Sequence, residues 1–466
     1  MDYTGLTSLS NIGLLKAGGA ILALFTAAIL SVAMQGTAPS PLPCDVRSFG
    51  AIADDGEVDT VAIQRAIDSC AGSGQAVVIP AGRFDSGGLT LRSNLSLHLS
   101  AGAHLVMSTR FADYAARPAI EGHRALLFGD EVRNVEISGT GTIDGAAGPI
   151  YAAMDRIIAA DPDDPAADER ARFGLMFNRC SNVRVRDITI RDTPMFLVGI
   201  RQCENVVLDG FTLEAPIDSH NTDGLQIIDS ADVRVTNCRI SVGDDGITTK
   251  AQGVRPIERL LVNNCVIRSD DGAIKLGTQS RGDLRDSLFS NIAIVDSRYG
   301  IAAFMIRGGN YTNNRFTNVR IATGGRHRRG YPIYVDIDDR ERGAGGRMGS
   351  IEGLTFDNID ITTGGNLLIA GHPRSPIRDL SLSNIRIRST GADPIAANDR
   401  KPFGNRRFRP IPGSPDYAPI VADLVLGEIA GLTMANVDIA GPAVRPRVAT
   451  RNVRQAVRDG QPLRTD

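Results

Sequence analysis

The amino-acid sequence predicts an all-β protein built as a parallel β-helix, in which one chain coils into stacked turns of short strands. A six-residue phrase with Asn at its third position recurs at a step of 27 residues. Each repeat alternates apolar residues of strand type and is bounded by Asn, Gly or Asp, as is typical of short strands joined by turns. The chain has 50 Gly and only 5% aromatic residues, a balance that favours many turns over a helical bundle.

The repeat is clearest between residues 235 and 321, where the phrase reads VTNCRI, VNNCVI, FSNIAI and FTNVRI. Its Asn residues are Asn237, Asn264, Asn291 and Asn318, and the phrase returns at Asn358, Asn384 and Asn436. Such a unit cannot bury an apolar face alone, so neighbouring units must stack, with strands about 4.8 Å apart. We expect each Asn to be buried at a coil corner and to bond its counterparts in adjacent coils. Leucine-rich repeats also use a corner Asn, but the chain lacks their Leu framework.

Two long loops interrupt the repeat, because the step is 40 residues from Asn318 to Asn358 and 52 residues from Asn384 to Asn436. Both inserts are basic, and their cations are Arg326, His327, Arg328, Arg329, Arg340, Arg342 and Arg347 in the first and Arg400, Lys401, Arg406, Arg407 and Arg409 in the second. Loops on a rigid solenoid often carry binding groups, so these are either binding loops or solvated ones.

The N-terminal segment predicts export. Residues 17–34 form an apolar run preceded by Lys16 and followed by small residues. We interpret residues 1–38 as a signal peptide or an uncleaved N-terminal anchor. In either case the rest of the chain is translocated, to the periplasm or outside the cell, and no other membrane association is expected.

The two ends of the solenoid differ. Residues 60–71 place Ile63, Ile67 and Cys70 on one helical stripe, with Asp59 or Thr60 as N-cap. We expect this amphipathic helix to cover the unpaired first coil. The β-helix domain is expected over residues 44–443, and residues 444–466 are expected to form a polar, irregular tail.

Charge and cysteine usage exclude several classes. A formal net charge of −2 gives no reason to expect a nucleic-acid partner. Six cysteines without a CxxC pair suit an oxidising compartment but suggest neither zinc nor another cofactor. We expect Cys44 to bridge to Cys70. The other four, Cys180, Cys203, Cys238 and Cys265, are expected to pack in the core as small apolar residues.

Acidic turn motifs mark three consecutive coils. They read Asn221-Thr222-Asp223-Gly224, Gly243-Asp244-Asp245-Gly246 and Ser269-Asp270-Asp271-Gly272. Since their separations are close to one coil, the carboxylates should stack on one face, and at least one pKa should rise. A structural turn needs a single Asp-Gly pair, which does not explain five aspartates in register. The cluster therefore predicts a catalytic site.

The chain resembles glycoside hydrolase family 28, the polygalacturonase family. The shared phrases are FGA at 49–51, DT at 59–60, VIPAG at 78–82, GTIDG at 141–145, NTDG at 221–224 and GDDGITTK at 243–250. The stretches IKLGTQS and GIAAFMIRGG are similar to bacterial members. The resemblance implies a right-handed, pectin lyase-like solenoid and an inverting hydrolase of an acidic or pectin-type polysaccharide.

Site roles follow from the same resemblance. It implies that Asp244 is the general acid, kept protonated by its crowded surroundings, and that Asp223 and Asp245 hold and activate water. An inverting pair needs carboxyl groups about 6.5–9.5 Å apart. Asn221 would orient the pair. Lys250 and Lys275, which lie just after two of these turns, are expected to offset charge or to bind substrate. Asp271, in the third turn, is expected to bind substrate.

Two departures from the family pattern concern substrate binding. Where the family has Gly-His-Gly, this chain reads DGAIKLGT at 271–278; where it has Arg-Ile-Lys, this chain reads GIAAF at 300–304. We expect Arg307, Tyr299 or the arginine-rich insert to take over recognition, because guanidinium groups bind carboxylates well.

Two other functions compete with hydrolysis. Clustered aspartates could bind Ca²⁺ in a polysaccharide lyase of the same fold. A non-catalytic surface β-helix is the second, although it has no use for crowded carboxylates. The hydrolase is favoured, acting as a monomer on a polysaccharide or oligosaccharide.

Overall fold

The computed structural model describes residues 44–161, 173–324, 330–337, 347–390, 415–417, 419–442 and 447–463. The N-terminal segment over residues 1–38 lies outside these ranges, as do all the basic insert residues named above except Arg347, which is exposed.

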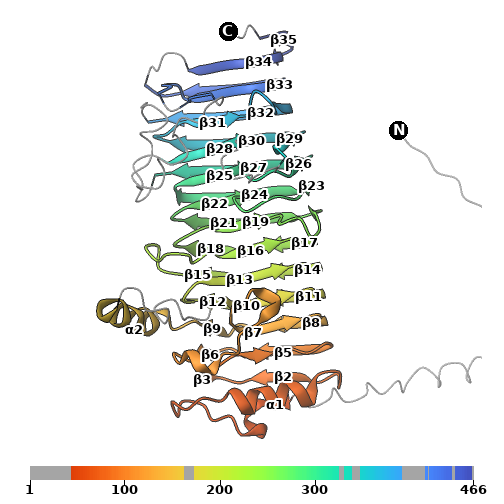
Figure 1. Ribbon diagram of the computed structural model, residues 1–466, viewed down its shortest axis with the longest axis vertical. Helices are drawn as coiled ribbons and strands as arrows, with labels where there is room; N and C mark the ends of the chain where they lie inside the picture. Colours follow the sequence, from red (N-terminus) through yellow and green to blue (C-terminus); the bar gives the residue numbers. More distant parts are fainter. Residues whose placement is uncertain are drawn as a thin grey trace, which may run out of the picture. The chain divides into compact units, whose positions relative to one another are not determined.

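The described strands form a stack of coils in which, except for the last strand, each strand pairs in parallel with its equivalents in the neighbouring coils (Figure 1). Three ladders of strands run along the stack. The site sheet contains β4 (Leu89–Thr90), β7 (Ala125–Asp130), β10 (Phe173–Asn178), β13 (Phe196–Arg201), β16 (Leu225–Ile228), β19 (Ile247–Lys250), β22 (Gly272–Leu276), β25 (Tyr299–Met305), β28 (Tyr331–Ile337), β31 (Leu367–Ala370) and β33 (Leu424–Ala440).

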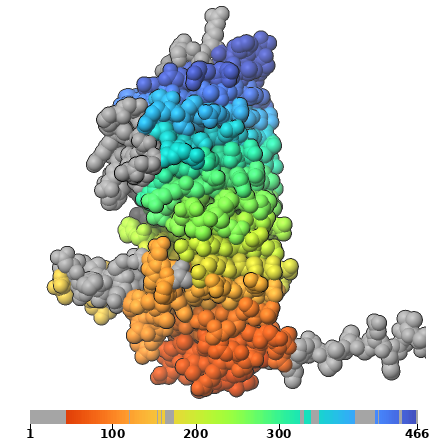
Figure 2. Space-filling view, turned by 45° about the vertical axis from the view of Figure 1, so that its right-hand side comes forward, coloured from red at the N-terminus to blue at the C-terminus, as the bar shows by residue number. Residues whose placement is uncertain are grey.

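The second sheet contains β1 (Cys44–Asp45), β2 (Ala76–Ile79), β5 (Leu95–Leu99), β8 (Arg133–Ser138), β11 (Ser181–Arg186), β14 (Glu204–Asp209), β17 (Ala231–Thr236), β20 (Ile257–Glu258), β23 (Leu284–Arg285), β26 (Asn310–Thr312) and β29 (Ser350–Glu352). The third sheet contains β3 (Gly82–Ser86), β6 (Ala103–Met107), β9 (Thr142–Asp144), β12 (Thr189–Arg191), β15 (Thr212–Glu214), β18 (Arg239–Val242), β21 (Leu261–Ser269), β24 (Leu288–Ser297), β27 (Arg315–Thr323), β30 (Thr355–Thr363) and β32 (Ile377–Ser389). The longer strands from β21 onward bend around the corner between these two sheets. Figure 2 shows the sequence colours as successive bands, one coil above the next.

The interior of the coils is apolar because every second strand residue points inward. Leu225, Ile247 and Ile274 follow one another in register along the site sheet, and each is fully buried. Aromatic rings stack in the same way, with centroids 4.6 Å apart for Phe289 and Phe316. The predicted all-β parallel β-helix is confirmed.

The Asn ladder is present, but its side chains are exposed rather than buried. Asn264 donates to Asn237 Oδ1 at 2.7 Å, and Asn358 donates to Asn318 Oδ1 at 2.7 Å. These residues have φ near 55°, the left-handed region that Asn tolerates best among residues with a Cβ. At such a corner two consecutive residues point outward between inward-facing neighbours, so the Asn side chain lies on the surface. The prediction of burial was wrong for this reason.

The N-terminal cap is confirmed. Helix α1 (Thr60–Cys70) covers the first coil and buries Ile63 and Ile67 completely (Figure 1). Asp59 is its N-cap residue, although its side chain accepts a hydrogen bond from the Ile52 backbone rather than capping the helix. The Cys44–Cys70 disulfide ties this helix to β1.

The other cysteines divide into two pairs. Cys180 and Cys203 are buried and free, as expected. Cys238 and Cys265 form a disulfide, which the sequence did not predict. The two residues are separated by 27 positions, one full coil, so stacking places them side by side.

The C-terminal segment also differs from the prediction of an irregular tail. β34 (Val448–Arg458) pairs in parallel with β33, with Val448 opposite Leu424, and β35 (Gln461–Pro462) turns back antiparallel to it. Of its side chains only Val453 and Ala456 are buried. Among the described strands, β33 stacks on one side of this last coil and the short β35 pairs with its C-terminal end. The polar composition of this segment therefore gave no sign of a strand. The backbone of β34 nevertheless pairs with the edge of the stack.

A second helix, α2 (Ala147–Ala160), follows β9 and projects beside the coils, where Tyr151 donates a hydrogen bond to the Pro194 carbonyl at 2.8 Å (Figure 1). Short 3-10 turns occur at η1 (Val46–Phe49), η2 (Phe111–Asp113) and η3 (Pro118–Ile120). Neither α-helix in the described part of the chain has the length and apolarity needed to cross a bilayer.

Candidate active site

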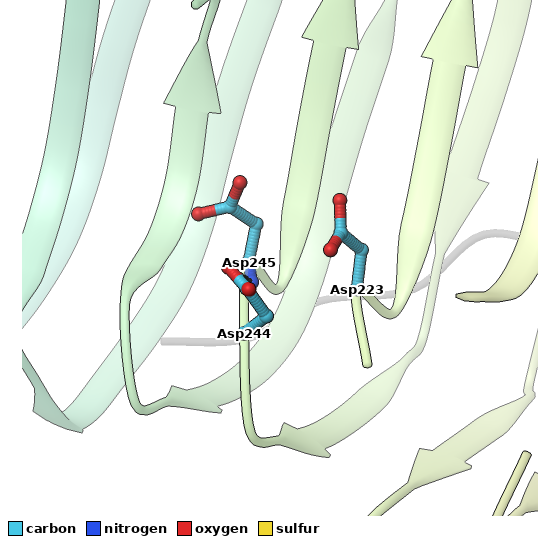
Figure 3. A group of neighbouring side chains, drawn as sticks. All are labelled: Asp223, Asp244 and Asp245. Carbon is cyan, nitrogen blue, oxygen red and sulfur yellow. Dashed lines mark hydrogen bonds between the residues drawn. The ribbon is translucent and has the colours of Figure 1, made fainter. Parts of the chain in front are cut away.

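The acidic turns lie immediately before β16, β19 and β22, at the start of three adjacent strands of the site sheet (Figure 3). Backbone bonds fix their register: Gly224 N donates to the Asp245 carbonyl, and Gly246 N donates to the Gly272 carbonyl, both at 2.8 Å. Asp223, Asp245 and Gly272 therefore occupy the same position in three successive coils, and the predicted stacking of the turns is confirmed.

The carboxylates converge. One oxygen from each of Asp223, Asp244 and Asp245 lies within 4.8 Å of the others. This closest approach is shorter than the separation of about 6.5–9.5 Å between carboxyl groups that the sequence led us to expect. Figure 3 shows Asp223 and Asp245 extending in the same direction from neighbouring turns, with Asp244 directed differently.

Burial gives the three groups different environments. Asp223 and Asp245 are 5% and 4% exposed, whereas Asp244 is half-buried. Loss of hydration raises the pKa of Asp245 to about 6, with the neighbouring Asp244 and Asp271 charges adding to the effect and Lys275 opposing it. The pKa of Asp223 is also raised, chiefly by burial and against the pull of Lys250. The cluster thus pairs two buried carboxyls with one that solvent and substrate can reach.

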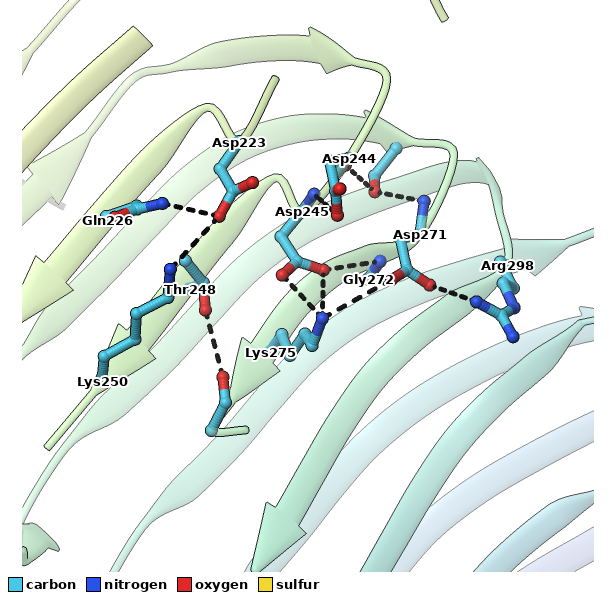
Figure 4. A network of polar contacts seen from close by, with 12 residues as sticks. Asp223, Gln226, Asp244, Asp245, Thr248, Lys250, Asp271, Gly272, Lys275 and Arg298 are labelled. Atoms are coloured by element: carbon cyan, nitrogen blue, oxygen red, sulfur yellow. Dashed lines mark hydrogen bonds and ion pairs between the residues drawn. The ribbon is translucent and has the colours of Figure 1, made fainter. Parts of the chain in front are cut away.

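Two lysines compensate the buried charges (Figure 4). Lys275 Nζ lies 2.7 and 3.0 Å from the two oxygens of Asp245 and 3.5 Å from Asp271 Oδ2. Lys250 Nζ lies 3.6 Å from Asp223 Oδ2. Both lysines therefore lie against the carboxylates and offset their charge, and Asp271 belongs to the same ion-pair network. Contact of these three residues with substrate stays a prediction.

Glycine at the third stacked position has a steric reason. A Cβ at Gly272 would lie 3.1 Å from Asp245 Oδ1, the oxygen that accepts a hydrogen bond from Gly272 N at 3.1 Å. Hydroxyl groups hold the turns themselves: Thr222 Oγ1 accepts from Gly243 N, and Ser269 Oγ donates to the Asp244 carbonyl at 2.6 Å. The geometry of the carboxylates is therefore fixed by backbone contacts between coils.

Sequence reasoning missed two partners of the cluster. Gln226 donates to Asp223 Oδ2 at 2.8 Å, and Arg298 donates to Asp271 Oδ1 at 2.8 Å while lying over the Tyr299 ring (Figure 4). Gln226 follows the NTDG turn by only two residues, and Arg298 lies one step of 27 beyond Asp271. Adding the coil step to each aspartate would have drawn attention to Arg298.

Three residues that were expected to orient the carboxylates or to bind substrate lie in other surroundings. Asn221 is exposed with φ of 57°, and within the described residues the side-chain bond to Asp223 comes from Gln226 rather than from Asn221. Tyr299 is 1% exposed and packs against Tyr331 and Phe304, so burial excludes it as a surface contact for substrate. Arg307 follows the C-terminal end of β25, whereas the acidic turns lie at the N-terminal ends of their strands.

Charge compensation also bears on metal binding. The spacing of the three carboxylates would suit a cation ligated by oxygen atoms. Lys250 and Lys275 already place ammonium groups against the two buried members. The negative charge of the cluster is therefore offset by groups of the chain itself.

Comparisons with known proteins agree on one family. Residues 70–401 match the model of Glycosyl hydrolases family 28. The chain is 27% identical over 320 residues to an exo-poly-α-D-galacturonosidase of Dickeya chrysanthemi, covering 57% of this chain and 52% of that protein. It is 23% identical over 361 residues to an endo-polygalacturonase of Pectobacterium carotovorum subsp. carotovorum, covering 72% and 85%. The chain spans about half the length of the first curated relatives it matches.

Solved structures share the fold. A family 28 exopolygalacturonase of Yersinia enterocolitica superposes with a TM-score of 0.68 at 21% identity, covering 91% of this chain and 79% of the other. A polygalacturonase from Erwinia carotovora ssp. carotovora gives 0.61 at 18% identity, covering 90% and 97%. The architecture is a right-handed parallel β-helix. Because the family model covers well over half of its length, the chain belongs to glycosyl hydrolases family 28.

Proposed function

We propose that this protein hydrolyses glycosidic bonds in polygalacturonan, the acidic backbone of pectin. The observation that carries the proposal is the convergence of Asp223, Asp244 and Asp245, two of them buried and one accessible. The relatives named above, a galacturonosidase and a polygalacturonase, support the choice of substrate class.

Each carboxylate has a role that its environment suits. Asp244, the half-buried member, gives its proton to the glycosidic oxygen as the bond to the anomeric carbon breaks. A water held between Asp223 and Asp245 attacks that carbon and passes its proton to one of these two carboxylates. Both products leave as sugars with free hydroxyl groups, and no other reactant is consumed.

The stereochemical outcome follows from this arrangement. Two neighbouring carboxylates flank the proposed water, which favours direct displacement and inversion over a covalent intermediate on a single nucleophile. The closest carboxylate oxygens lie nearer to each other than an inverting pair requires, so the stereochemistry of the reaction has to be measured. NMR of the first-formed anomer decides it, since inversion and retention give opposite anomers.

The first experiment replaces the proposed acid. Asp244→Asn should lower the release of reducing ends from polygalacturonan by roughly 10²–10⁴-fold, because a general acid contributes about that much. Asp286→Asn is the matched control: it makes the same chemical change at an exposed corner, where Asp286 accepts a hydrogen bond from Asn313. The circular dichroism and melting temperature of both variants should match the parent. Full activity in Asp244→Asn would overturn the assignment.

Product analysis separates hydrolysis from elimination. A hydrolase leaves saturated products and keeps its activity in a chelator, whereas a Ca²⁺-dependent lyase leaves an unsaturated end that absorbs ultraviolet light and is inactivated. The paired lysines favour the first outcome.

We propose further that the catalytic domain acts outside the cytoplasm as a monomer. This domain was predicted over residues 44–443, and β34 adds one more coil to it. The apolar run over residues 17–34 and the two disulfides suit an oxidising compartment. Cell fractionation and light scattering of the purified protein test location and oligomeric state.

A further inference from the structure

The outer face of the site sheet changes from apolar to polar and back to apolar along the stack. One row of equivalent positions shows the change, and its members in coil order are Phe128, Met176, Gly199, Gln226, Thr248, Lys275, Ala302, Tyr334 and Leu368. The catalytic carboxylates lie beside the middle of this row. The polar positions are therefore confined to a few coils.

The apolar part on the N-terminal side is covered by the segment over residues 118–123. Ile120 is 3% exposed and packs with Phe128, Phe173 and Met176 in a cluster separate from the main core. The segment is held in place from both ends, because Arg117 lies over the Phe128 ring and Arg124 donates to the Tyr114 carbonyl. This cover forms a wall across the sheet face.

The apolar part on the C-terminal side is covered as well. Tyr299, Phe304 and Tyr334 are each at most 1% exposed, and they pack with Tyr417 and Ala422 in a second separate cluster. The polar strip between the two covered clusters runs from Arg201 on β13 to Lys275 on β22. It spans three strand spacings, about 14 Å. A binding strip of this length accommodates a short stretch of polysaccharide rather than a long one.

A pocket of about 240 Å³ lies at the N-terminal end of the strip, directly against the wall. Ile120, Phe173 and Phe196 contribute to its apolar side. Polar groups come from the cations Arg201 and Lys250, from Gln226 and from the acidic Glu121. Its volume is below the roughly 300–1,000 Å³ usual for pockets that hold drug-sized ligands, which suits a single sugar ring. Gln226 and Lys250 also contact Asp223, so the pocket adjoins the reacting bond.

Arg201 lines this pocket together with Lys250. It is half-buried, and in the sheet register it stands two coils before Lys250, with Ile228 between them. Its Nη1 donates to Asn178 Oδ1 at 3.2 Å, and Asn178 in turn donates to Asp130 Oδ1 at 2.8 Å. This chain of bonds orients the guanidinium group, whose planar fork matches a carboxylate.

We propose that this pocket receives the single uronic acid residue at a chain end and that Arg201 binds its carboxylate. The proposal rests on the proposed hydrolysis of polygalacturonan and adds the position of the cut. Because the wall over β7 and β10 stops the chain one residue from the catalytic carboxylates, the enzyme releases monomers from an end.

Product length tests the position of the cut. Incubation with oligogalacturonides of defined length should give galacturonic acid as the only small product from the earliest time point. The viscosity of polygalacturonan should fall slowly relative to the release of reducing ends. Dimers, or a mixture of lengths at early times, would overturn the terminal pocket.

Variants test Arg201. Arg201→Gln should raise KM for oligogalacturonides by roughly 10–100-fold, the effect of losing a hydrogen bond to a charged group, with a smaller change in kcat. The same variant should act on substrates methyl-esterified at the terminal residues with nearly unchanged KM. Arg201→Lys should recover part of the affinity. Arg184→Gln, on the exposed face of β11, is the matched control.

Melting temperatures show whether the Arg201→Gln variant keeps its fold. If it does not, KM of the Arg201→Lys variant tests the same contact. An active Arg201→Gln enzyme with unchanged KM and unchanged preference for the free acid would overturn this inference alone. Absence of hydrolysis in the parent enzyme would instead count against the proposed function.

Discussion

Asp245 and Lys275 form the closest ion pair of the catalytic cluster, and both are buried. Removing a carboxylate from water raises its pKa, whereas an adjacent ammonium group lowers it. For Asp245 the first effect is larger, so its pKa rises from the usual 3.8 to about 6. Lys275 therefore keeps the pKa of Asp245 lower than burial alone would make it, so Asp245 stays ionised at lower pH.

This pair predicts a pH dependence. Asp245 must be ionised to accept a proton from water, so kcat/KM should fall as the pH drops below about 6. Lys275→Gln removes a charge that lowers this pKa, so the acidic limb of the profile should move to higher pH by about one unit or more. Kinetics from pH 4 to 8 measure the shift.

Arg285→Gln provides the control, because it breaks an exposed ion pair with Glu258 on the second sheet. Its profile should match that of the parent. An acidic limb that stays in place in Lys275→Gln would show that Asp245 does not control it.

The sequence predicted some residues of this site and missed others. The three aspartates could be placed together because the coil step converts sequence distance into spatial distance. Gln226 and Arg298 were missed because a hydrogen-bond partner depends on rotamers and on the outward or inward direction of a side chain. Tyr299 was misjudged for a related reason: the residues that bury it come from distant segments, among them Tyr417.

At the scale of elements, the corner residues determine where one sheet ends and the next begins. Asn318 has φ of 54° and both donates to Asn291 and accepts from Asn358. A left-handed conformation costs a residue with a Cβ roughly 1–2 kcal/mol, a cost that Asn reduces and Gly avoids. The repeating Asn thus serves backbone conformation first and the exposed ladder second.

Two substitutions separate these contributions. Asn318→Ala should lower the free energy of unfolding by about 1–2 kcal/mol, because it loses both the ladder bonds and the tolerance for positive φ. Asn318→Gly loses the bonds but keeps the backbone conformation, so it should be less destabilising. Denaturant titration followed by circular dichroism measures both. Equal losses would mean that the side-chain ladder, not the backbone, dominates.

The elements that sequence analysis missed lie outside the 27-residue repeat. β34 buries only Val453 and Ala456, and α2 lies beside the coils rather than within the repeat. In contrast, α1 was predicted nearly to the residue because its apolar stripe faces a core that must be covered.

Over the whole stack, stability is a sum over neighbouring coils, and the end coils are the weakest because they have one neighbour. The two disulfides close loops of nearly equal length, with sequence separations of 26 and 27 residues. Cys44–Cys70 lies at the N-terminal end, whereas Cys238–Cys265 has coils on both sides. Position in the stack, rather than loop length, should therefore distinguish their effects.

Paired substitutions test this difference. Replacing Cys44 and Cys70 by Ser should cost about 2–4 kcal/mol and should speed amide hydrogen exchange in α1 and β2. Replacing Cys238 and Cys265 by Ser should leave exchange at the N-terminal end unchanged. Identical exchange patterns in the two variants would contradict the idea that end coils open first.

The sequence by itself determined the coil step, the stacked strands, the N-terminal cap and the group of aspartates, because each depends on spacing along the chain. Tertiary structure alone decided which side chains the catalytic carboxylates contact, the burial that raises the pKa of Asp245, and the two covered clusters that bound the polar strip. These features arise where residues from several coils and from the covering segments meet. The distances between these residues depend on the lengths of the inserts and on the directions of the side chains. A repeating sequence pattern predicts neither of them.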